Sequence, residues 1–222
     1  MSLLLEDEKQ CGIVYKKVFN LIYEHYINYC KNWLLKNPSK NLKRTKICDI
    51  YNQDIGLDKE FENIMDSYME NLDDLYFEIL ENVSTIFENY PDLKFHIRIK
   101  MKESILGKIR SKNCSQNGTF PLKDCLNDLI ACRIIDSNYK ANEYNIKNTL
   151  ENLKKNEYNI KNMDRDNKGY KAHHIYFKYN NNTFPFEIQI WNGDDESNNI
   201  KLHKAHKQYY IKEYIEEYSD FR

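Results

Sequence analysis

The hydrophobic period of the chain changes at Pro91, and no other feature of the sequence limits the possible folds as strongly. Before it, apolar residues recur three or four positions apart over residues 14–22 and 64–79, which is the repeat of an amphipathic helix. After it, apolar and basic or histidine residues alternate over residues 95–101, which is the repeat of a half-buried strand. The sequence therefore predicts a helical N-terminal part followed by a part that contains a β-sheet.

The remaining elements follow from the same two repeats. Residues 36–57 hold proline, glycine and a basic stretch, which predicts a linker with short local structure between the first two helices. Later elements are expected as a helix from near Ser104, strands over residues 126–135, 157–163, 173–180 and 184–191, a helix over 141–155 and a closing helix from about 200. We therefore expect an α+β protein. An N-terminal helical region covers residues 1–90, and a mixed β-sheet flanked by helices covers residues 91–222.

Composition excludes several classes of protein. Of the 222 residues, 41% are hydrophobic, enough to bury a core and to argue against wholesale disorder. The 33 basic and 34 acidic residues nearly cancel, so any site for a polyanion must be local. We find neither a secretory signal nor an apolar run of membrane-spanning length, and so expect a cytoplasmic protein without a membrane partner. The six cysteines form no CxxC pair and are expected to be free thiols, and no histidine or cysteine spacing predicts zinc.

A strongly basic segment covers residues 94–112. It contains seven basic residues and one acid, in a chain whose net charge is −1. Strand alternation places Arg98 and Lys100 on one face. Ser104 and Lys108 lie one turn apart on the helix that follows. Cations that converge from a strand and a helix N-terminus suit a triphosphate, and the alternative is a solvated charged surface.

Two acidic residues lie in otherwise apolar strand segments. Asp128 precedes the apolar residues 129–132, and Glu187 interrupts the apolar residues 184–191. There, Glu187 and Gln189 face away from the apolar side chains between them. A carboxylate in so apolar a strand is costly to bury without a partner. If the two outward faces line a cleft, Asp128 and Glu187 can share Mg²⁺ through hard oxygen ligands; solvation at an edge strand is the alternative.

A glycine turn leads into a predicted strand over residues 168–174, which read Lys-Gly-Tyr-Lys-Ala-His-His. Glycine permits close approach of the backbone, and the adjacent Tyr170 can stack on a base. Taken alone, the segment is more typical of a plain hairpin turn with a core tyrosine.

Four motifs thus follow one another along the chain. They read Arg98-Ile-Lys100 with Ser104 and Lys108, Asn127-Asp128-Leu-Ile-Ala-Cys-Arg133-Ile-Ile, Gly169-Tyr170-Lys-Ala-His-His174 and Glu187-Ile-Gln189-Ile. Over about residues 90–210, this order resembles the synthetase domain of the RelA/SpoT family. The resemblance implies a nucleotidyltransferase-like fold. It also implies transfer of the pyrophosphate group of ATP to the 3′-hydroxyl of GDP or GTP, which gives (p)ppGpp and AMP.

The resemblance also implies roles for single residues. The residues that match ATP-binding positions are Arg98, Lys100, Ser104, Lys108, Arg110 and Arg133. Those that match acceptor-binding positions are Lys168, Gly169, Tyr170, His174 and His206, for which His203 is the alternative. Tyr170 matches the tyrosine that stacks on the acceptor guanine. Asp128 and Glu187 match the ligands of a Mg²⁺ cofactor. Together with Gln189 they are the expected catalytic residues, and Glu187 is expected to accept the 3′-hydroxyl proton.

The sequence departs from the family pattern in several places. Trp191-Asn192 stands where Arg-Thr usually follows Glu-Ile-Gln-Ile, which removes a cation expected near the acceptor. Ala131 replaces a glycine, and the segment before Gly169 is shorter than usual and lacks the Lys-Asp-Tyr lead-in. The first change bears directly on the identity of the acceptor.

The length of the chain leaves no room for the hydrolase and regulatory domains of the long family members, so it resembles a small alarmone synthetase. Our first hypothesis is a GTP diphosphokinase that uses ATP and GDP or GTP, and small members of this kind are often homo-oligomers. The second hypothesis keeps the chemistry but uses the 3′ CCA end of tRNA, with the basic loop Lys40 to Arg44 as an RNA contact. A non-catalytic nucleotide sensor or RNA-binding module, and an enzyme that transfers AMP, are the remaining alternatives.

Overall fold

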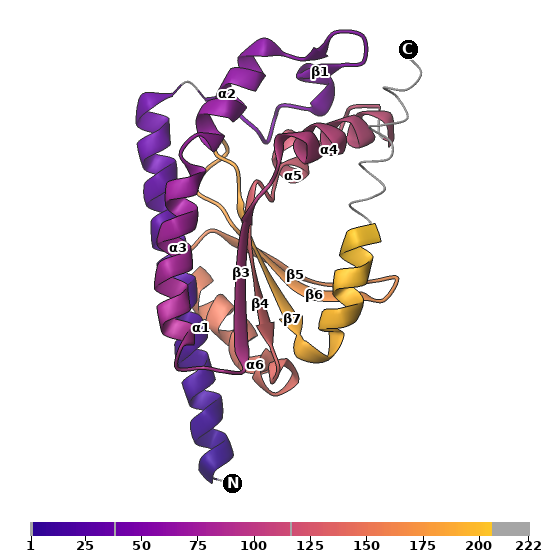
Figure 1. Ribbon diagram of the computed structural model, residues 1–222. Coiled ribbons are helices and arrows are strands. Elements are labelled where there is room, and N and C mark those ends of the chain that lie inside the picture. The colour runs from indigo at the N-terminus through magenta and orange to yellow at the C-terminus, as the bar shows by residue number, and fades with distance from the viewer. Residues whose placement is uncertain (1, 38, 116, 206–222) are drawn as a thin grey trace.

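The computed structural model in Figure 1 describes residues 2–37, 39–115 and 117–205. These residues form a central five-stranded sheet in the order β3-β4-β7-β6-β5. Its strands are β3 (Leu93–Ile99), β4 (Ile130–Asp136), β5 (Ile160–Asn167), β6 (Tyr170–Phe177) and β7 (Phe186–Asn192). Strands β4 and β7 are parallel, and the other neighbours are antiparallel. A mixed sheet with helices around it confirms the predicted α+β class.

The N-terminal part is helical, as predicted. Its helices are α1 (Ser2–Lys36), α2 (Lys59–Met69) and α3 (Leu72–Phe87). The linker holds the short helix η1 (Ile47–Asp49) and a hairpin of β1 (Tyr51–Asn52) and β2 (Gly56–Leu57). The periodic stretch over residues 64–79 is two helices and not one. The break at residues 70–71 turns the chain while Tyr68 and Leu72, on either side of it, both remain buried.

The later elements lie close to their predicted ranges. They are α4 (Lys102–Ser115), α5 (Leu122–Cys125), α6 (Tyr139–Lys155), η2 (Gly193–Asp195) and a helix over residues 196–205. The first strand was expected to reach Met101, but β3 ends at Ile99 because α4 begins at Lys102, and Met101 is exposed. Strand β4 begins four residues later than expected, because residues 126–129 form the bend that leads from α5 into the strand.

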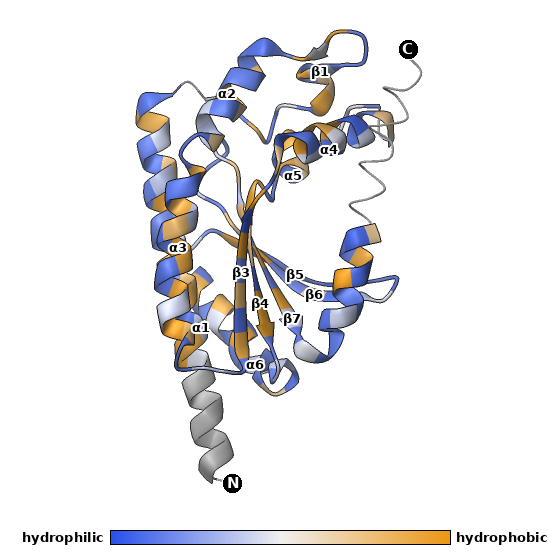
Figure 2. Ribbon diagram, viewed as in Figure 1, coloured by the Kyte–Doolittle hydropathy of each residue, from blue (hydrophilic) through white to orange (hydrophobic). Residues whose placement is uncertain are grey.

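Helices α1, α3 and α6 cover one face of the sheet (Figure 1). Ile134 of β4, Ile188 of β7 and Phe19 of α1 are fully buried in one hydrophobic cluster, and Figure 2 shows apolar residues concentrated along the strands. Burying a side chain of this size stabilises a fold by about 1.5–3 kcal/mol. The Tyr15 hydroxyl also donates a hydrogen bond to the buried Asp136 at the end of β4, at 2.9 Å. The N-terminal helices and the sheet therefore share one core.

The opposite face of the sheet, called the front face below, carries polar side chains. Helices α4 and α5 bound it at one end, and the helix over residues 196–205 lies near the β5–β6 turn (Figure 1). Lys168 and Gly169 form this two-residue turn with φ of 52° and 87°, a left-handed conformation that glycine adopts without strain. The Asn198 amide donates to the Gly169 carbonyl at 2.7 Å, which attaches the helix to the turn.

The described cysteine side chains are free thiols, as predicted, and they are Cys30, Cys48, Cys114, Cys125 and Cys132. Within the same part of the chain, we find no helix with both the length and the apolar character needed to cross a bilayer.

Candidate active site

The register of the sheet brings the predicted polar residues together on the front face. Gln189 of β7 pairs with Arg133 of β4 on one side and with His174 of β6 on the other. Glu187, two residues before Gln189, pairs with Tyr176. Because residues two apart on a strand share a face, these side chains point to the same side of the sheet. Glu187 and Gln189 thus leave the core face, as the alternation predicted.

Three cations surround the carboxylate of Asp128, which lies just before β4. The Lys100 Nζ is 2.7 Å from Oδ2, the Lys108 Nζ is 3.1 Å from Oδ1, and the Arg98 Nη2 is 3.5 Å from Oδ2. Asp128 is buried, and burial alone would raise its pKa. The charges of Lys108 and Lys100 outweigh burial and hold the pKa of Asp128 well below its usual range. The carboxyl group is therefore ionised at any pH near neutrality.

These cations come from two elements. The pairing of β3 with β4 continues past the end of β3, because the Lys100 N–H donates to the Leu129 carbonyl at 2.7 Å. This extension keeps Arg98 and Lys100 on one face, whereas Lys108 reaches Asp128 from α4. Burial lowers the pKa of Lys100; at Lys108 the charge of Asp128 outweighs burial and the pKa is raised. Three cations and one carboxylate leave an excess of positive charge, which suits a polyanionic ligand.

The carboxylate of Glu187 is held by His174 and Gln189. The His174 Nδ1 lies 2.9 Å from Oε1, and the Gln189 Nε2 donates to Oε2 at 2.9 Å. Burial and the charge of Asp128 raise the pKa of Glu187, but its hydrogen bond with His174 helps to lower it, and the net shift is downward. A carboxylate only accepts, so the His174 Nδ1 carries a proton and the Nε2 can accept from the Tyr170 hydroxyl at 3.0 Å. His174 therefore links Glu187 to Tyr170.

Aromatic rings line the front face between β4 and the helix over residues 196–205. The fully buried Trp191 lies against Arg133, whose Cζ is 3.4 Å from the centre of the indole ring. The rings of Tyr170 and His203 lie 5.2 Å apart, and those of Trp191 and His203 lie 5.4 Å apart. The predicted stacking residue Tyr170 thus belongs to a cluster that includes Trp191.

The remaining predicted residues lie at the edges of this arrangement. Ser104 and Arg110 are half-buried on α4. Lys168 is exposed in the β5–β6 turn and makes no hydrogen bond or ion pair with the residues that the structure describes. His206 lies outside the described residues, whereas His203, the alternative, contacts Arg133 and Tyr170.

The sequence did not single out Tyr176 or Arg165. The Arg165 Nη2 donates to the Tyr176 hydroxyl at 3.0 Å, and this hydroxyl lies 3.3 Å from the His174 Nδ1. Tyr176 could have been found, because it continues the alternation that begins with Tyr170 and His174. Arg165 could not, because it comes from another strand and carries no motif.

The two carboxylates suit a magnesium ion that is shared with a substrate. Asp128 and Glu187 offer hard oxygen ligands, and the charge of Asp128 acts to raise the pKa of Glu187. No cluster of three or more ligating side chains occurs among the described residues. Mg²⁺ is commonly held by one or two carboxylates together with substrate phosphates, so this pair fits the ion if phosphate oxygens complete its coordination.

Comparison with known proteins gives a match over the segment that contains these residues. A family model described as "Region found in RelA / SpoT proteins" matches residues 97–214. No curated protein matches the chain.

Proposed function

Because the chain belongs to the RelA/SpoT family, a family of pyrophosphotransferases of the (p)ppGpp synthetase type, we propose that it transfers the pyrophosphate group of ATP to the 3′-hydroxyl of GDP or GTP. The observation that carries the proposal is the arrangement of two ionised carboxylates on one face. Asp128 is surrounded by cations, and Glu187 is held by His174 and Gln189. One carboxylate lies in a binding site for phosphate, and the other can take a proton.

On the donor side, the triphosphate of ATP would contact Arg98, Lys100 and Lys108. Phosphoryl-type transfer depends mainly on alignment and charge neutralisation, so a cluster of cations supplies much of what the reaction needs. Asp128 and Glu187 would hold Mg²⁺, which neutralises charge on the phosphates when it is bound. Lys100 and Lys108 would then turn from the carboxylate to the phosphate oxygens.

On the acceptor side, the base would stack on Tyr170 and the 3′-hydroxyl would face Glu187. The 3′-oxygen forms a bond to the β-phosphorus of ATP, the bond from that phosphorus to the oxygen bridging the α-phosphate breaks, and AMP leaves. The hydroxyl proton passes to Glu187, whose hydrogen bonds with His174 and Gln189 keep it oriented. Holding the 3′-hydroxyl in line with the β-phosphorus then contributes further to the acceleration of the reaction.

A transfer assay tests this function directly. ATP labelled in its β-phosphate is incubated with Mg²⁺ and GDP, GTP or deacylated tRNA in separate reactions. We expect label on the guanosine nucleotide and release of AMP, and we expect Glu187→Gln to abolish both with an unchanged circular dichroism spectrum. Release of pyrophosphate would indicate transfer of AMP instead. Full activity of Glu187→Gln would contradict the role of the carboxylate.

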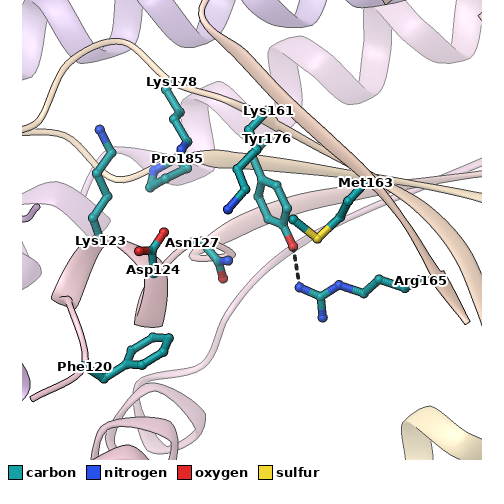
Figure 3. A pocket seen from close by; sticks show the side chains of 10 residues that line it. All are labelled: Phe120, Lys123, Asp124, Asn127, Lys161, Met163, Arg165, Tyr176, Lys178 and Pro185. Carbon is teal, nitrogen blue, oxygen red and sulfur yellow. Dashed lines mark hydrogen bonds between the residues drawn. The ribbon is translucent and has the colours of Figure 1, made fainter. Parts of the chain in front are cut away.

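A second candidate acceptor, the 3′ end of tRNA, is favoured by a basic cavity next to the carboxylates. The cavity has a volume of about 280 Å³, and Figure 3 shows side chains from β5, β6 and the α5 region around it. Its cationic residues are Lys123, Lys161, Arg165 and Lys178. It lies beside the two carboxylates, because Asn127 and Tyr176 also line it. A polynucleotide carries phosphates beyond the reacting nucleotide, and such a cavity can bind them.

The basic loop that the sequence suggested as an RNA contact adjoins this cavity. Burial and the charge of Lys161 lower the pKa of Lys178, and Lys43 from the loop contributes to the same shift. Burial likewise lowers the pKa of Lys123 to about 8, again with a contribution from Lys43. These lysines repel one another, and an anion in the cavity would relieve the repulsion.

Charge reversal separates the two acceptors. If tRNA is the acceptor, Lys161→Glu combined with Lys178→Glu should reduce transfer to tRNA by about tenfold or more, with a steep salt dependence in the wild type. Lys155→Glu, an exposed change at the end of α6, serves as the control and should have little effect. Loss of transfer to GDP alone would assign the cavity to the free nucleotide, and unchanged transfer to tRNA would contradict an RNA contact here.

A further inference from the structure

The end of β6 that leads out of the β5–β6 turn has a strand on only one side. Strand β7 pairs with β6 over residues 173–177, whereas β5 pairs with it over residues 170–177. Among the strands that the structure describes, residues 170–172 therefore pair with β5 alone. Backbone N–H and C=O groups that point to the other side need another partner, because an unpaired polar group away from water lowers stability. Tyr170, on which the acceptor base would stack, lies in this half-paired segment.

Asn199, on the helix over residues 196–205, takes the place of a strand there. The Lys171 N–H donates to the Asn199 Oδ1 at 3.1 Å, and the Asn199 Nδ2 donates to the Lys171 carbonyl at 2.7 Å. A side-chain amide offers the same donor and acceptor as a peptide group, so one asparagine continues the ladder where β7 no longer pairs with β6. Asn199 is fully buried, so water is a poor substitute for these two hydrogen bonds.

The preceding residue holds the backbone on the other side of Tyr170. The Asn198 Nδ2 donates to the Gly169 carbonyl at 2.7 Å. Asn198 is exposed, so this hydrogen bond competes with water and contributes less than those of Asn199. Two successive asparagines of one helix thus bind the backbone on both sides of Tyr170.

The ring of Tyr170 contacts the same helix. Its centre lies 5.2 Å from that of the His203 ring, at an interplanar angle of 75°. Burial, together with the charge of Arg133, lowers the pKa of His203 to about 4, so the imidazole is neutral at pH 7. On the side of the sheet, the Tyr170 hydroxyl lies 3.0 Å from the His174 Nε2. The helix therefore contacts Tyr170 through its ring as well as through the neighbouring backbone.

We propose that Asn199 is a positioning residue, which fixes Tyr170 in place for the acceptor base. The proposal rests on the proposed function, because it takes Tyr170 as the residue on which that base stacks. A stacking surface that is rigid before its ligand binds loses less conformational entropy on binding, so the affinity is higher. Asn199 has this role because it is buried and binds both backbone polar groups of Lys171, the residue next to Tyr170.

Hydrogen exchange read by mass spectrometry tests the structural part without any substrate. Asn199→Leu removes both hydrogen bonds and keeps a side chain of similar size. Exchange of the backbone amides over residues 168–171 should become faster by about tenfold or more. The amides of residues 173–177, which pair on both sides, should keep their rate. Asn142→Leu is the matched control, because it removes a hydrogen bond of 3.0 Å to the buried Asp136, and it should leave exchange at the turn unchanged.

The transfer assay tests the functional part. GDP is the acceptor, or deacylated tRNA if the label goes there. Asn199→Leu should raise the KM for the acceptor by about fivefold to tenfold, toward the loss expected when a base no longer stacks, and should leave kcat and the KM for ATP within about twofold. Tyr170→Leu should raise the same KM. Adding Asn199→Leu to Tyr170→Leu should raise it little further, because both changes act through one ring.

Equal increases of the KM for ATP and for the acceptor in Asn199→Leu would overturn the proposal, because a purely structural role predicts them. Additive effects of Asn199→Leu and Tyr170→Leu would overturn it as well, since Asn199 would then not act through Tyr170. If Asn199→Leu fails to fold, Asn199→Asp replaces it, because aspartate keeps the size and the accepting oxygen and lacks only the donor, and the same increase for the acceptor alone is expected. A wild type that transfers to no acceptor would contradict the proposed function, whereas unchanged exchange at the turn in the folded variant would overturn the role of Asn199 by itself.

Discussion

Asp128→Asn removes one negative charge from among three cations and leaves the size of the side chain unchanged. The side chains of Lys100 and Lys108 are only 12% and 19% exposed, so water compensates poorly for the lost partner. Breaking a buried ion pair costs about 3–5 kcal/mol. Lys108 keeps a hydrogen bond to Asn127 at 3.3 Å, so we expect a loss near the lower end, about 3 kcal/mol of unfolding free energy.

Urea unfolding followed by circular dichroism measures this loss. Asp124→Asn is the matched control, because Asp124 is exposed on the neighbouring α5, and it should change the unfolding free energy by no more than about 0.5 kcal/mol. The pKa of Asp128 is lowered in the folded protein, so its stabilisation is present above the unfolded pKa of about 3.9 and is lost as the pH falls further. The gap between wild type and Asp128→Asn should therefore close in acid.

Ligand binding completes the test. The three cations remain in Asp128→Asn, so ATP without Mg²⁺ should bind at least as tightly as it binds the wild type. ATP at a hundred times its dissociation constant should then restore about 2.7 kcal/mol of stability, although transfer is abolished. Equal stability of Asp128→Asn and wild type at pH 7, or weaker binding of free ATP by the variant, would refute the view that this carboxylate holds the cations for a phosphate ligand.

Four further substitutions test the fold around the site. Gly169→Ala forces alanine to a φ of 87° and should lower the unfolding free energy by about 1 kcal/mol in urea. Gly12→Ala within α1 should instead raise it by about 0.5–1 kcal/mol. Equal effects of the two substitutions would contradict the turn geometry. Tyr15→Phe removes a hydrogen bond to buried Asp136 and should lower the unfolding free energy by about 1–3 kcal/mol, measured by the same method. An unchanged unfolding free energy would show that the remaining partners of Asp136 satisfy its carboxylate. The pKa of His203 is lowered to about 4, so the wild type should lose unfolding free energy as the pH falls from about 6.5 to 4. His203→Gln should lose less over that range. Parallel pH profiles of the unfolding free energy would contradict a neutral His203.

Strand alternation predicted the part of the site that lies within single strands. It placed Arg98 with Lys100 and Glu187 with Gln189, because side chains two apart share a face whatever the neighbouring strands are. Strand alternation could not predict the order of the strands in the sheet. The position of Gln189 between Arg133 and His174 depends on the parallel pairing of β4 with β7 and on the antiparallel pairing of β6 with β7, which no local pattern encodes.

Of the two residues that sequence reasoning missed, Tyr176 lies on the same strand as Tyr170 and His174, whereas Arg165 lies on another strand and carries no motif. Arg165 comes from β5, and the predicted range of that strand ended before it. The strand was expected over residues 157–163, and the residues that follow Met163 are polar. In the structure they pair with β6 as far as the turn at Lys168 and Gly169. Tertiary pairing overrode the local preference there, as it often does at the polar end of a hairpin.

The carboxylates do not decide which substrates the enzyme uses. Asp128 and Glu187 would act in the same way on any 3′-hydroxyl, since in the proposed reaction they would face the phosphates and the reacting oxygen and not the bases. Selection must come from the groups on either side of them. On one side Trp191 lies against Arg133, and on the other the basic cavity adjoins Tyr176. Trp191 and Tyr176 lie outside the four motifs, so two proteins with identical motifs can differ in their substrates while they share the same chemistry.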